Sequence, residues 1–265
     1  ARRTPLKELL ADPAAMEAAI DSQTIMMVGS APCFPYGLID PIEALGALAE
    51  RRGVWLHVDA CVGGYIAPFV RMNGGDVPPF DFEVPGVSSM SADLHKYGYC
   101  AKGASTVFFR SEHLRAHMIF EVGDWPAGKM VTPTLAGTRP GGAIAAAWAV
   151  MNVLGVEGYR AKHAEVTEAR QAIGEGAKPQ GWRLLGDPQL GILSFTREDV
   201  NPFAVLKHLY GRGWVTSAVT EPSGLHLMLS PVHKSVADTY LADLAWATQM
   251  ARDDGARPAE ARYGG

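Results

Sequence analysis

Apolar positions in the first hundred residues alternate between helical spacing and short continuous runs. Helical spacing predicts a helix over 6–20, and the apolar run at 25–28 predicts a buried strand after it. Asp40 and Pro41 can cap a second helix that runs to Arg52, with Gly53 ending it. Three further apolar runs predict strands over 54–58, 87–91 and 105–109.

These strands are apolar along most of their length and are separated by helices or long connections. Such a pattern indicates an α/β fold with a mainly parallel sheet that is covered on both faces. Ligands bind beyond the carboxyl ends of the strands in sheets of this kind. Asp59 follows one strand, and the pair His95 and Lys96 follows the end of a later one. The sequence therefore predicts a site at this edge of the sheet.

The second half of the chain has a different pattern. An Ala-rich stretch predicts a helix over 141–154, a second helix is predicted over 159–173, and 174–179 then breaks the pattern. Beyond it we predict strands over 190–195, 215–219 and 225–229 and helices over 203–211 and 236–251. We therefore expect an α/β domain at 1–175 and a small α+β domain at 176–265.

Composition narrows the class of protein. A chain of 265 residues, 48% of them hydrophobic, can bury a substantial core. The net charge of -4, with Lys and Arg scattered, argues against a nucleic-acid partner. The three cysteines have no spacing typical of a disulfide framework or a zinc site, which favours the cytoplasm.

The sequence also indicates whether the chain spans a membrane and whether it is part of a longer protein. The most apolar stretch, 143–154, is shorter than the roughly 20 residues that a bilayer span needs, so no membrane span is predicted. The N-terminus has neither an initiating Met nor a signal-type apolar core. We expect the chain to be cut from a longer one.

Asp59 and Lys96 are the candidate catalytic pair. A pyridoxal 5'-phosphate (PLP) enzyme needs a lysine that binds the cofactor as a Schiff base, and a carboxylate that keeps the pyridine nitrogen protonated. Taken singly, an Asp at a strand end is commonly a cap and a Lys is commonly a solvated surface group. Their shared position at the sheet edge favours PLP chemistry. Apolar surroundings and a cationic ring would lower the pKa of Lys96.

A metal site is the competing interpretation of the same region. His57 and Asp59 lie two residues apart on a strand, so they share a face, and His95 could join them. No further ligands stand at a suitable spacing. We therefore expect His57 to be a hydrogen-bonded core residue.

Three long motifs stand along the chain: HVDACVGG at 57–64, SADLHKYGYCAKG at 91–103 and GTRPGG at 137–142. They are flanked by SAPCFP at 30–35 and by Asp124 and Trp125. In their order and intervals these motifs resemble the sphingosine-1-phosphate lyase family, and the similarity thins after about 175. The resemblance implies the aspartate-aminotransferase fold (fold type I), with its large-domain part followed by the small C-terminal domain.

The resemblance also implies roles for individual residues in PLP binding. Lys96 would be the Schiff-base lysine, Asp59 the pyridine partner, Cys61 a neighbour of the ring face and His95 a contact of the cofactor phosphate. The loop at 137–142 would reach the cofactor phosphate of the neighbouring subunit in a homodimer, through Gly137, Thr138 and backbone N–H groups. The backbone N–H groups of a glycine-rich turn at a helix start can bind an anion such as this phosphate.

Two more residues are candidates for the chemistry. Lys102 is similar to a second lysine that the family keeps near the substrate, although a surface lysine between glycines is an equal alternative. Tyr36, in a Pro-rich loop, would line the entrance. Thr138 stands where the family often has Ser and keeps the hydroxyl.

The function implied by the resemblance is retro-aldol cleavage of a phosphorylated sphingoid base to a fatty aldehyde and phosphoethanolamine. A PLP-dependent amino-acid decarboxylase of the same superfamily is the first alternative. Chains of the family begin about two hundred residues earlier, and that part carries the rest of the cofactor domain. A catalytically silent fragment is therefore the second alternative.

Overall fold

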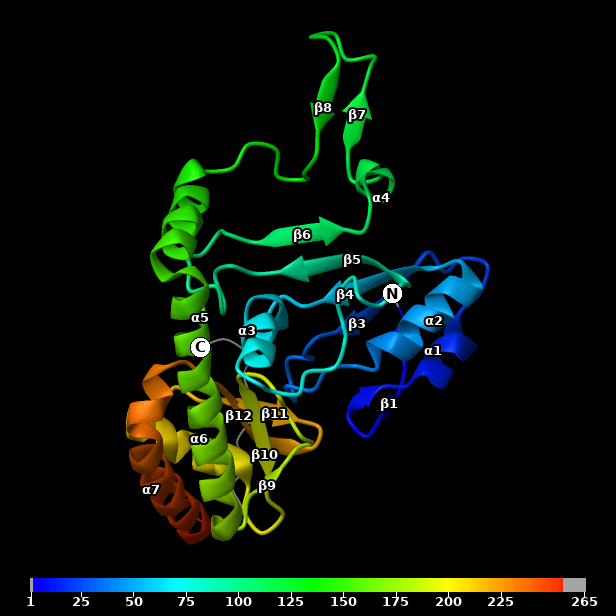
Figure 1. The fold of residues 1–265 in the computed structure, drawn as a ribbon. Coiled ribbons are helices and arrows are strands. Elements are labelled where there is room, and N and C mark those ends of the chain that lie inside the picture. The colour runs from blue at the N-terminus through cyan, green and yellow to red at the C-terminus, as the bar shows by residue number, and fades with distance from the viewer. Residues whose placement is uncertain (1, 255–265) are drawn as a thin grey trace.

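The first half of the chain forms a four-stranded sheet with helices beside it. Residues 2–254 are described in this computed structural model (Figure 1). The strand order is β3-β4-β5-β6; β3, β4 and β5 run parallel, and β6 is antiparallel to β5. Their bounds are Met26–Ser30, Trp55–Asp59, Val87–Ala92 and Thr106–Phe109. The predicted mainly parallel sheet is confirmed.

Alternation of exposed and buried positions fixes which side of the sheet faces the core. Leu56 and Val58 of β4 are fully buried, as is Val87 of β5. The alternating residues Trp55, His57 and Asp59 of β4 are half-buried. The 3-10 helix η1 (Gly63–Tyr65) and helix α3 (Ala67–Met72) follow β4 directly. The carboxyl end of β4 is therefore packed firmly against the core.

Helix α2 (Ile42–Arg52) lies between β3 and β4 in the chain, as predicted. It ends at Gly53, whose φ of 61° lies in the left-handed region that favours glycine. The prediction that Asp40 caps this helix is wrong. Its buried carboxylate instead accepts the backbone N–H groups of Ala11 at 2.8 Å and Ser30 at 2.7 Å, which ties the N-terminal segment to β3.

The predicted helix over 6–20 is also wrong in its first half. Strands β1 (Leu6–Lys7) and β2 (Leu10–Ala11) form a short antiparallel hairpin, and the helix α1 covers only Pro13–Ala19. Asp12 caps α1 through the N–H of Ala14, and Pro13 occupies the first turn. Proline is favoured at a helix start and disfavoured inside one, so it marks where this helix begins.

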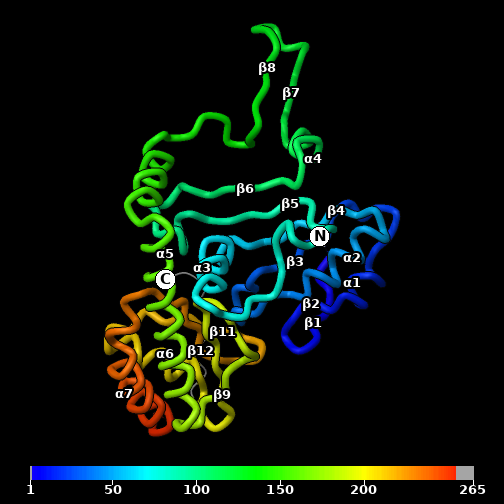
Figure 2. Tube along the Cα trace, viewed as in Figure 1, coloured from blue at the N-terminus to red at the C-terminus, as the bar shows by residue number. Residues whose placement is uncertain are grey.

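A hairpin projects away from the sheet beyond β6 (Figure 2). After helix α4 (Glu112–Ala116), strands β7 (Phe120–Val122) and β8 (Met130–Thr132) pair antiparallel. The chain then returns to helix α5 (Gly141–Ala177). The two helices predicted there are confirmed: α5 consists of two helical segments that meet at a kink at Gly155, where φ is 56° and ψ is -175°, values outside the helical region.

The C-terminal part is an antiparallel sheet with two helices, as predicted. The strand order is β11-β12-β10-β9, and the helices α6 and α7 pack on one another while α7 also packs on α5. The element bounds are η2 Lys178–Gln180, β9 Arg183–Leu184, β10 Ile192–Thr196, α6 Pro202–Gly211, β11 Ser217–Thr220, β12 Ser223–Met228 and α7 Val232–Asp253.

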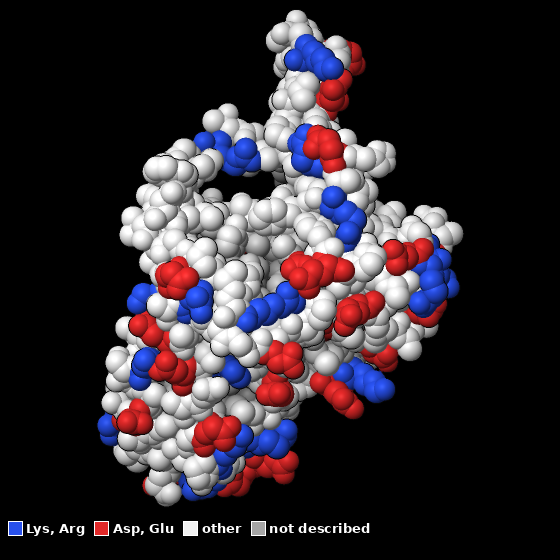
Figure 3. Space-filling model, in the orientation of Figure 1, with Lys and Arg blue, Asp and Glu red and all other residues white. Residues whose placement is uncertain are grey.

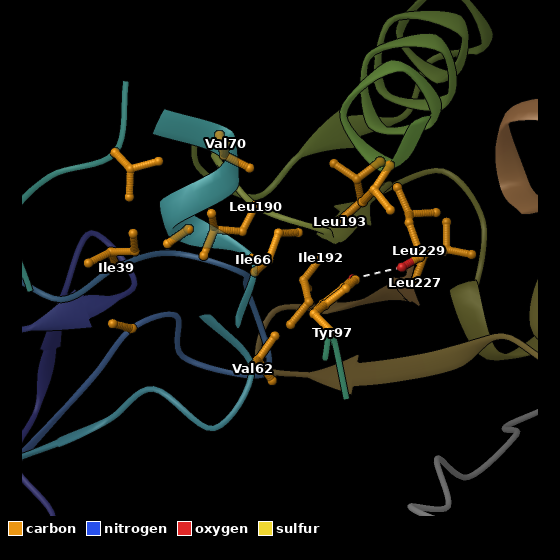
Figure 4. Packing of buried hydrophobic residues seen from close by; sticks show 14 of the residues in the cluster. Ile39, Val62, Ile66, Val70, Tyr97, Leu190, Ile192, Leu193, Leu227 and Leu229 are labelled. Atoms are coloured by element: carbon orange, nitrogen blue, oxygen red, sulfur yellow. Dashed lines mark hydrogen bonds between the residues drawn. The ribbon is translucent and has the colours of Figure 1, made fainter. Parts of the chain in front are cut away.

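One hydrophobic cluster runs through both parts of the chain. Side chains that flank η1, together with side chains from α3 and from the segment after β5, pack with side chains from β10 and β12 (Figure 4). The members labelled there include Val62, Ile66, Tyr97, Ile192 and Leu229. The domain boundary at 175/176 stays a prediction, and it falls in the last turn of α5.

Apolar surface is exposed at two places. Both edge strands of the four-stranded sheet carry exposed apolar side chains, on β3 and on β6. In the described residues, the helical stretch Gly141–Gln180 is one candidate membrane span by length and composition, with a mean hydropathy of 1.2 and 6% of its apolar window buried. A single helix of this kind is weak evidence for a span. The edge side chains are Met26, Val28, Val107 and Phe108.

Candidate active site

Asp59 closes β4, where the backbone turns toward η1. Its Oδ1 accepts hydrogen bonds from the backbone N–H of Cys61 at 3.1 Å and from Ser91 Oγ at 3.2 Å. Burial raises the pKa of this carboxyl, but hydrogen bonds from Cys61 and Ser91 and the nearby Lys96 outweigh burial and lower it. Asp59 is therefore an ionised carboxylate, and a carboxylate has acceptor sites beyond the two that these donors use.

Lys96 lies between Cys61 and Asp93. Its Nζ is 2.8 Å from Cys61 Sγ and 3.0 Å from Asp93 Oδ2. Burial raises the pKa of the Cys61 thiol, so the sulfur accepts as a neutral group. The expected fall in the pKa of Lys96 is wrong for this arrangement. Burial does lower it, but the hydrogen bonds to Cys61 and Asp93 outweigh burial and raise it.

His95 stands beside this lysine with a defined ring orientation. Its Nδ1 lies 2.7 Å from the carbonyl oxygen of Ala104, so Nδ1 carries the proton and donates it. Nε2 lies 3.6 Å from Asp93 Oδ2. This nitrogen is the atom that remains for a ligand, and it can donate to an anion when the ring is protonated.

His57 is held by the neighbouring strand. Nδ1 lies 2.7 Å from Ser89 Oγ and Nε2 lies 3.3 Å from Ser91 Oγ. Burial lowers the pKa of this imidazole, although Asp59 opposes the effect. Among residues 2–254, no group of three or more His, Cys, Asp or Glu side chains is arranged to hold a metal ion. The observed contacts make His57 a hydrogen-bonded residue of the sheet.

Comparisons with known proteins bear directly on this arrangement. A family model described as the pyridoxal-dependent decarboxylase conserved domain matches residues 10–197. The chain belongs to this family. Members of the pyridoxal-dependent decarboxylase family use PLP, and the matched residues include Asp59, Cys61, His95 and Lys96.

Sphingosine-1-phosphate lyases are among the proteins whose sequences are similar to this chain. The lyase of Oryza sativa subsp. japonica is 43% identical over 245 residues, covering 92% of this chain and 46% of the relative. The lyase of Arabidopsis thaliana is 41% identical, covering 94% of this chain and 46% of the relative. The chain thus spans about half the length of these relatives.

Solved structures confirm the fold-type prediction. The sphingosine-1-phosphate lyase of Burkholderia pseudomallei superposes with a TM-score of 0.90 at 38% identity, covering 95% of this chain and 58% of that one. The glutamate decarboxylase of Lactobacillus brevis superposes with a TM-score of 0.79 at 21% identity, which concerns the fold alone. The chain has the α/β fold of PLP-dependent fold type I enzymes.

The other candidates predicted for this pyridoxal-dependent site lie apart from Lys96 in the described chain. Tyr36 is buried with Leu38, Leu185 and Val219, and its hydroxyl donates to the carbonyl of Glu221. It therefore packs against the C-terminal part.

Lys102, Gly137 and Thr138 have no contact with Lys96 among the interactions of the described residues. Lys102 is exposed in the turn before β6. Gly137 has a φ of 63° and Thr138 is exposed; both lie in the segment between β8 and α5, which Figure 1 shows on the outer side of β6. Their roles stay predictions.

Asp93 is the site residue that sequence reasoning missed. It follows β5 and precedes Lys96 by three residues, a spacing that brings the two side chains together in a turn. Ser105 donates to its Oδ1, so the carboxylate is held on both oxygens. An acidic residue just past a strand end and next to a candidate lysine was the available signal.

Proposed function

We propose that this chain carries the lysine and carboxylate of a PLP-dependent carbon–carbon lyase that cleaves phosphorylated sphingoid bases to a fatty aldehyde and phosphoethanolamine. The observation that carries the proposal is the arrangement of Lys96 beside Cys61, next to an ionised Asp59, in a chain 43% identical to a sphingosine-1-phosphate lyase. The activity for which that relative is named supplies the substrate class.

The residues present fit PLP. Asp59 is ionised and can accept a further hydrogen bond, which suits a protonated pyridine nitrogen. Lys96 supplies the primary amine that forms a Schiff base with the cofactor aldehyde. His95 would contact the phosphate through Nε2. When bound, PLP supplies an electron-withdrawing ring that stabilises the carbanion left by bond cleavage.

The chain's own residues have separate tasks in this reaction. Asp59 stays ionised opposite the ring nitrogen. Lys96 must lose a proton before its amine can react, and Asp93 Oδ2, 3.0 Å away, holds the charged amine in position until then. A base would remove the proton from the substrate hydroxyl next to Cα, and Lys96 or Lys102 would return a proton at the carbon where the bond is cleaved. Tyr36 stays a proposed entrance residue.

A PLP-dependent amino-acid decarboxylase is the second candidate function, because the matching family model is described by that activity. The bond broken would then be the one from Cα to the carboxylate. Release of carbon dioxide from aromatic or acidic amino acids, without cleavage of a phosphorylated long-chain base, would favour this candidate.

We further propose a homodimer in which the 137–142 loop reaches the partner's cofactor. Exposed apolar side chains gather on the β7–β8 hairpin and on the first half of α5. Figure 3 shows few charged groups over the first half of α5, whereas the hairpin also carries charged side chains, among them the ion pair of Lys129 with Glu121. The exposed members include Trp125, Leu135, Ile144, Trp148 and Val153. Burying such a surface against a second copy removes it from water.

A catalytically silent fragment is the remaining alternative. The chain covers 46% of its relatives, and the open edges at β3 and β6 leave room for further strands on both sides of the sheet.

We place the protein in the cytoplasm, which suits its free cysteines Cys33, Cys61 and Cys100.

The test is reduction with borohydride after incubation with PLP, followed by peptide mass mapping. We expect the cofactor to be fixed on Lys96, with Lys96→Gln unlabelled and Lys102→Gln labelled as a matched control. Cleavage of a phosphorylated long-chain base is then assayed by aldehyde release. Absence of label on every lysine would contradict a working cofactor site in this chain and favour the silent fragment.

A further inference from the structure

Lys96 lies in a turn that is anchored to the C-terminal sheet by the next residue. Tyr97 is buried, and its hydroxyl lies 2.8 Å from the carbonyl oxygen of Gly191 and 2.7 Å from that of Leu229. Figure 4 shows the Tyr97 ring among Val62, Ile192 and Leu229, with its hydrogen bond to Leu229 drawn. The single hydroxyl proton can be donated to either carbonyl oxygen, so the side chain is held at the ends of both strands.

The receiving site is shaped for this hydroxyl. Gly191 and Leu229 flank the paired ends of β10 and β12, and the Leu229 N–H donates to the Gly191 carbonyl at 2.8 Å. A Cβ at Gly191 would lie 2.0 Å from the Tyr97 oxygen, so glycine leaves the space that the hydroxyl occupies. Burial raises the pKa of Tyr97, so the group remains a neutral donor.

The same two strands hold the loop on the other side of Asp59. Ser194 Oγ of β10 donates to the Pro35 carbonyl at 2.6 Å, and His226 Nε2 of β12 lies 3.0 Å from the Phe34 carbonyl. This loop begins at Ala31, whose N–H donates to the carbonyl of Asp59 at 2.9 Å. Both backbone segments that border the site thus rest on β10 and β12.

We propose that Tyr97 is a positioning residue, through which the C-terminal sheet holds the Lys96 turn so that Nζ stays between Cys61 and Asp93. The other contacts of the turn are made within it or to α5, including the Tyr99 ring against His163. Tyr99 N–H donates to the Lys96 carbonyl at 3.0 Å within the turn, and Tyr159 of α5 donates to the Gly98 carbonyl at 2.8 Å. Only Tyr97 links the turn to β10 and β12 among these three tyrosines. The inference rests on the proposed role of Lys96.

The test compares Tyr97→Phe with wild type and with Tyr240→Phe, and it needs no cofactor. Tyr240 of α7 is a fully buried tyrosine of the C-terminal part whose hydroxyl makes no hydrogen bond to the Lys96 turn in the described chain, so its variant is a matched control. Each protein is treated with a limiting amine-acylating reagent across neutral and alkaline pH. Peptide mass spectrometry then gives the labelling of Lys96 relative to the exposed Lys102.

Loss of the hydroxyl should free Lys96 from Cys61 and Asp93 and raise its relative labelling roughly fivefold, the size expected for one hydrogen bond. Tyr240→Phe should leave the ratio at the wild-type value. An unchanged ratio in a folded Tyr97→Phe protein would overturn the proposal and leave Tyr97 as a packing residue. Because PLP is absent, failure of cofactor binding would not affect this result.

Amide hydrogen exchange of the wild type decides the question if Tyr97→Phe does not fold. The Tyr99 amide in the Lys96 turn and the Leu229 amide at the end of β12 should then be protected to the same extent and open together. Exchange at Tyr99 through an opening that leaves Leu229 protected would overturn the proposal.

Discussion

The ion pair between Lys96 and Asp93 predicts how fast the lysine reacts. We expect Asp93→Asn to increase the reactivity of Lys96 toward an amine-acylating reagent in the absence of PLP. Asp93 Oδ2 lies 3.0 Å from Nζ and, with Cys61, raises the pKa of the lysine despite its burial. Below that pKa the rate follows the fraction of neutral amine, so removing the carboxylate charge should increase it.

The size of the effect follows from the distance. Two unit charges 3.0 Å apart attract by about 1.4 kcal/mol at the dielectric constant of water, which corresponds to roughly a tenfold change in the neutral fraction. This is a lower bound, because the Asp93 side chain is only 13% exposed and its surroundings screen less than water. Asparagine keeps a hydrogen-bond acceptor, so the change isolates the charge.

The assay is the ratio of Lys96 to Lys102 labelling, measured by peptide mass spectrometry at neutral pH. Asp124→Asn is the matched control, since it removes one negative charge from an exposed residue of the β7–β8 hairpin. We expect a ratio about tenfold above wild type for Asp93→Asn and no change for Asp124→Asn. Equal ratios in all three proteins would refute the reasoning that Asp93 holds the lysine proton.

Three further predictions concern stability and assembly. Gly63→Ala places a Cβ 2.1 Å from the Ala31 carbonyl oxygen, so the urea midpoint should fall by the equivalent of about 1–3 kcal/mol. Burial raises the pKa of Asp40 despite two N–H donors, so its contribution to stability should decrease as pH rises from 3.8 through the folded-state pKa. The urea midpoint of the wild type should therefore fall with pH over this range more steeply than that of Asp40→Asn. Equal dependence of the two midpoints on pH would contradict the prediction. Trp148→Glu should shift the sedimentation coefficient from dimer to monomer, whereas Val215→Glu, at an equally exposed site in the C-terminal part, should not.

Most strands could be predicted from sequence because each is a short apolar run that ends in polar or glycine residues. The error over 6–20 arose because the apolar spacing continues through a turn. Glu8 and Leu9 have positive φ values and Pro13 begins a new helix, and none of these changes the hydrophobic pattern. The break between two helices in this region was predicted correctly, because Gly155 has non-helical φ and ψ values and separates the two helical segments of α5.

The site could be predicted in part. Asp59 and Lys96 follow strand ends, and parallel strands bring those ends together. The contacts of Lys96 with Asp93 and Cys61 depend on the path of the turn, which periodicity does not define. Tyr36 was assigned to the entrance because of its loop, but its packing partners come from the C-terminal part, about 150 residues and more later in the sequence.

The kink at Gly155 restricts where α5 can tolerate a change in length. The segment after Gly155 carries most of the buried side chains of α5, and α5 packs against α7. Each residue of an α-helix advances about 1.5 Å and turns about 100°. A single residue inserted within this segment would therefore rotate part of its buried face away from its packing partners. Length variation among homologues should be found in the β7–β8 hairpin and not in the segment of α5 after Gly155.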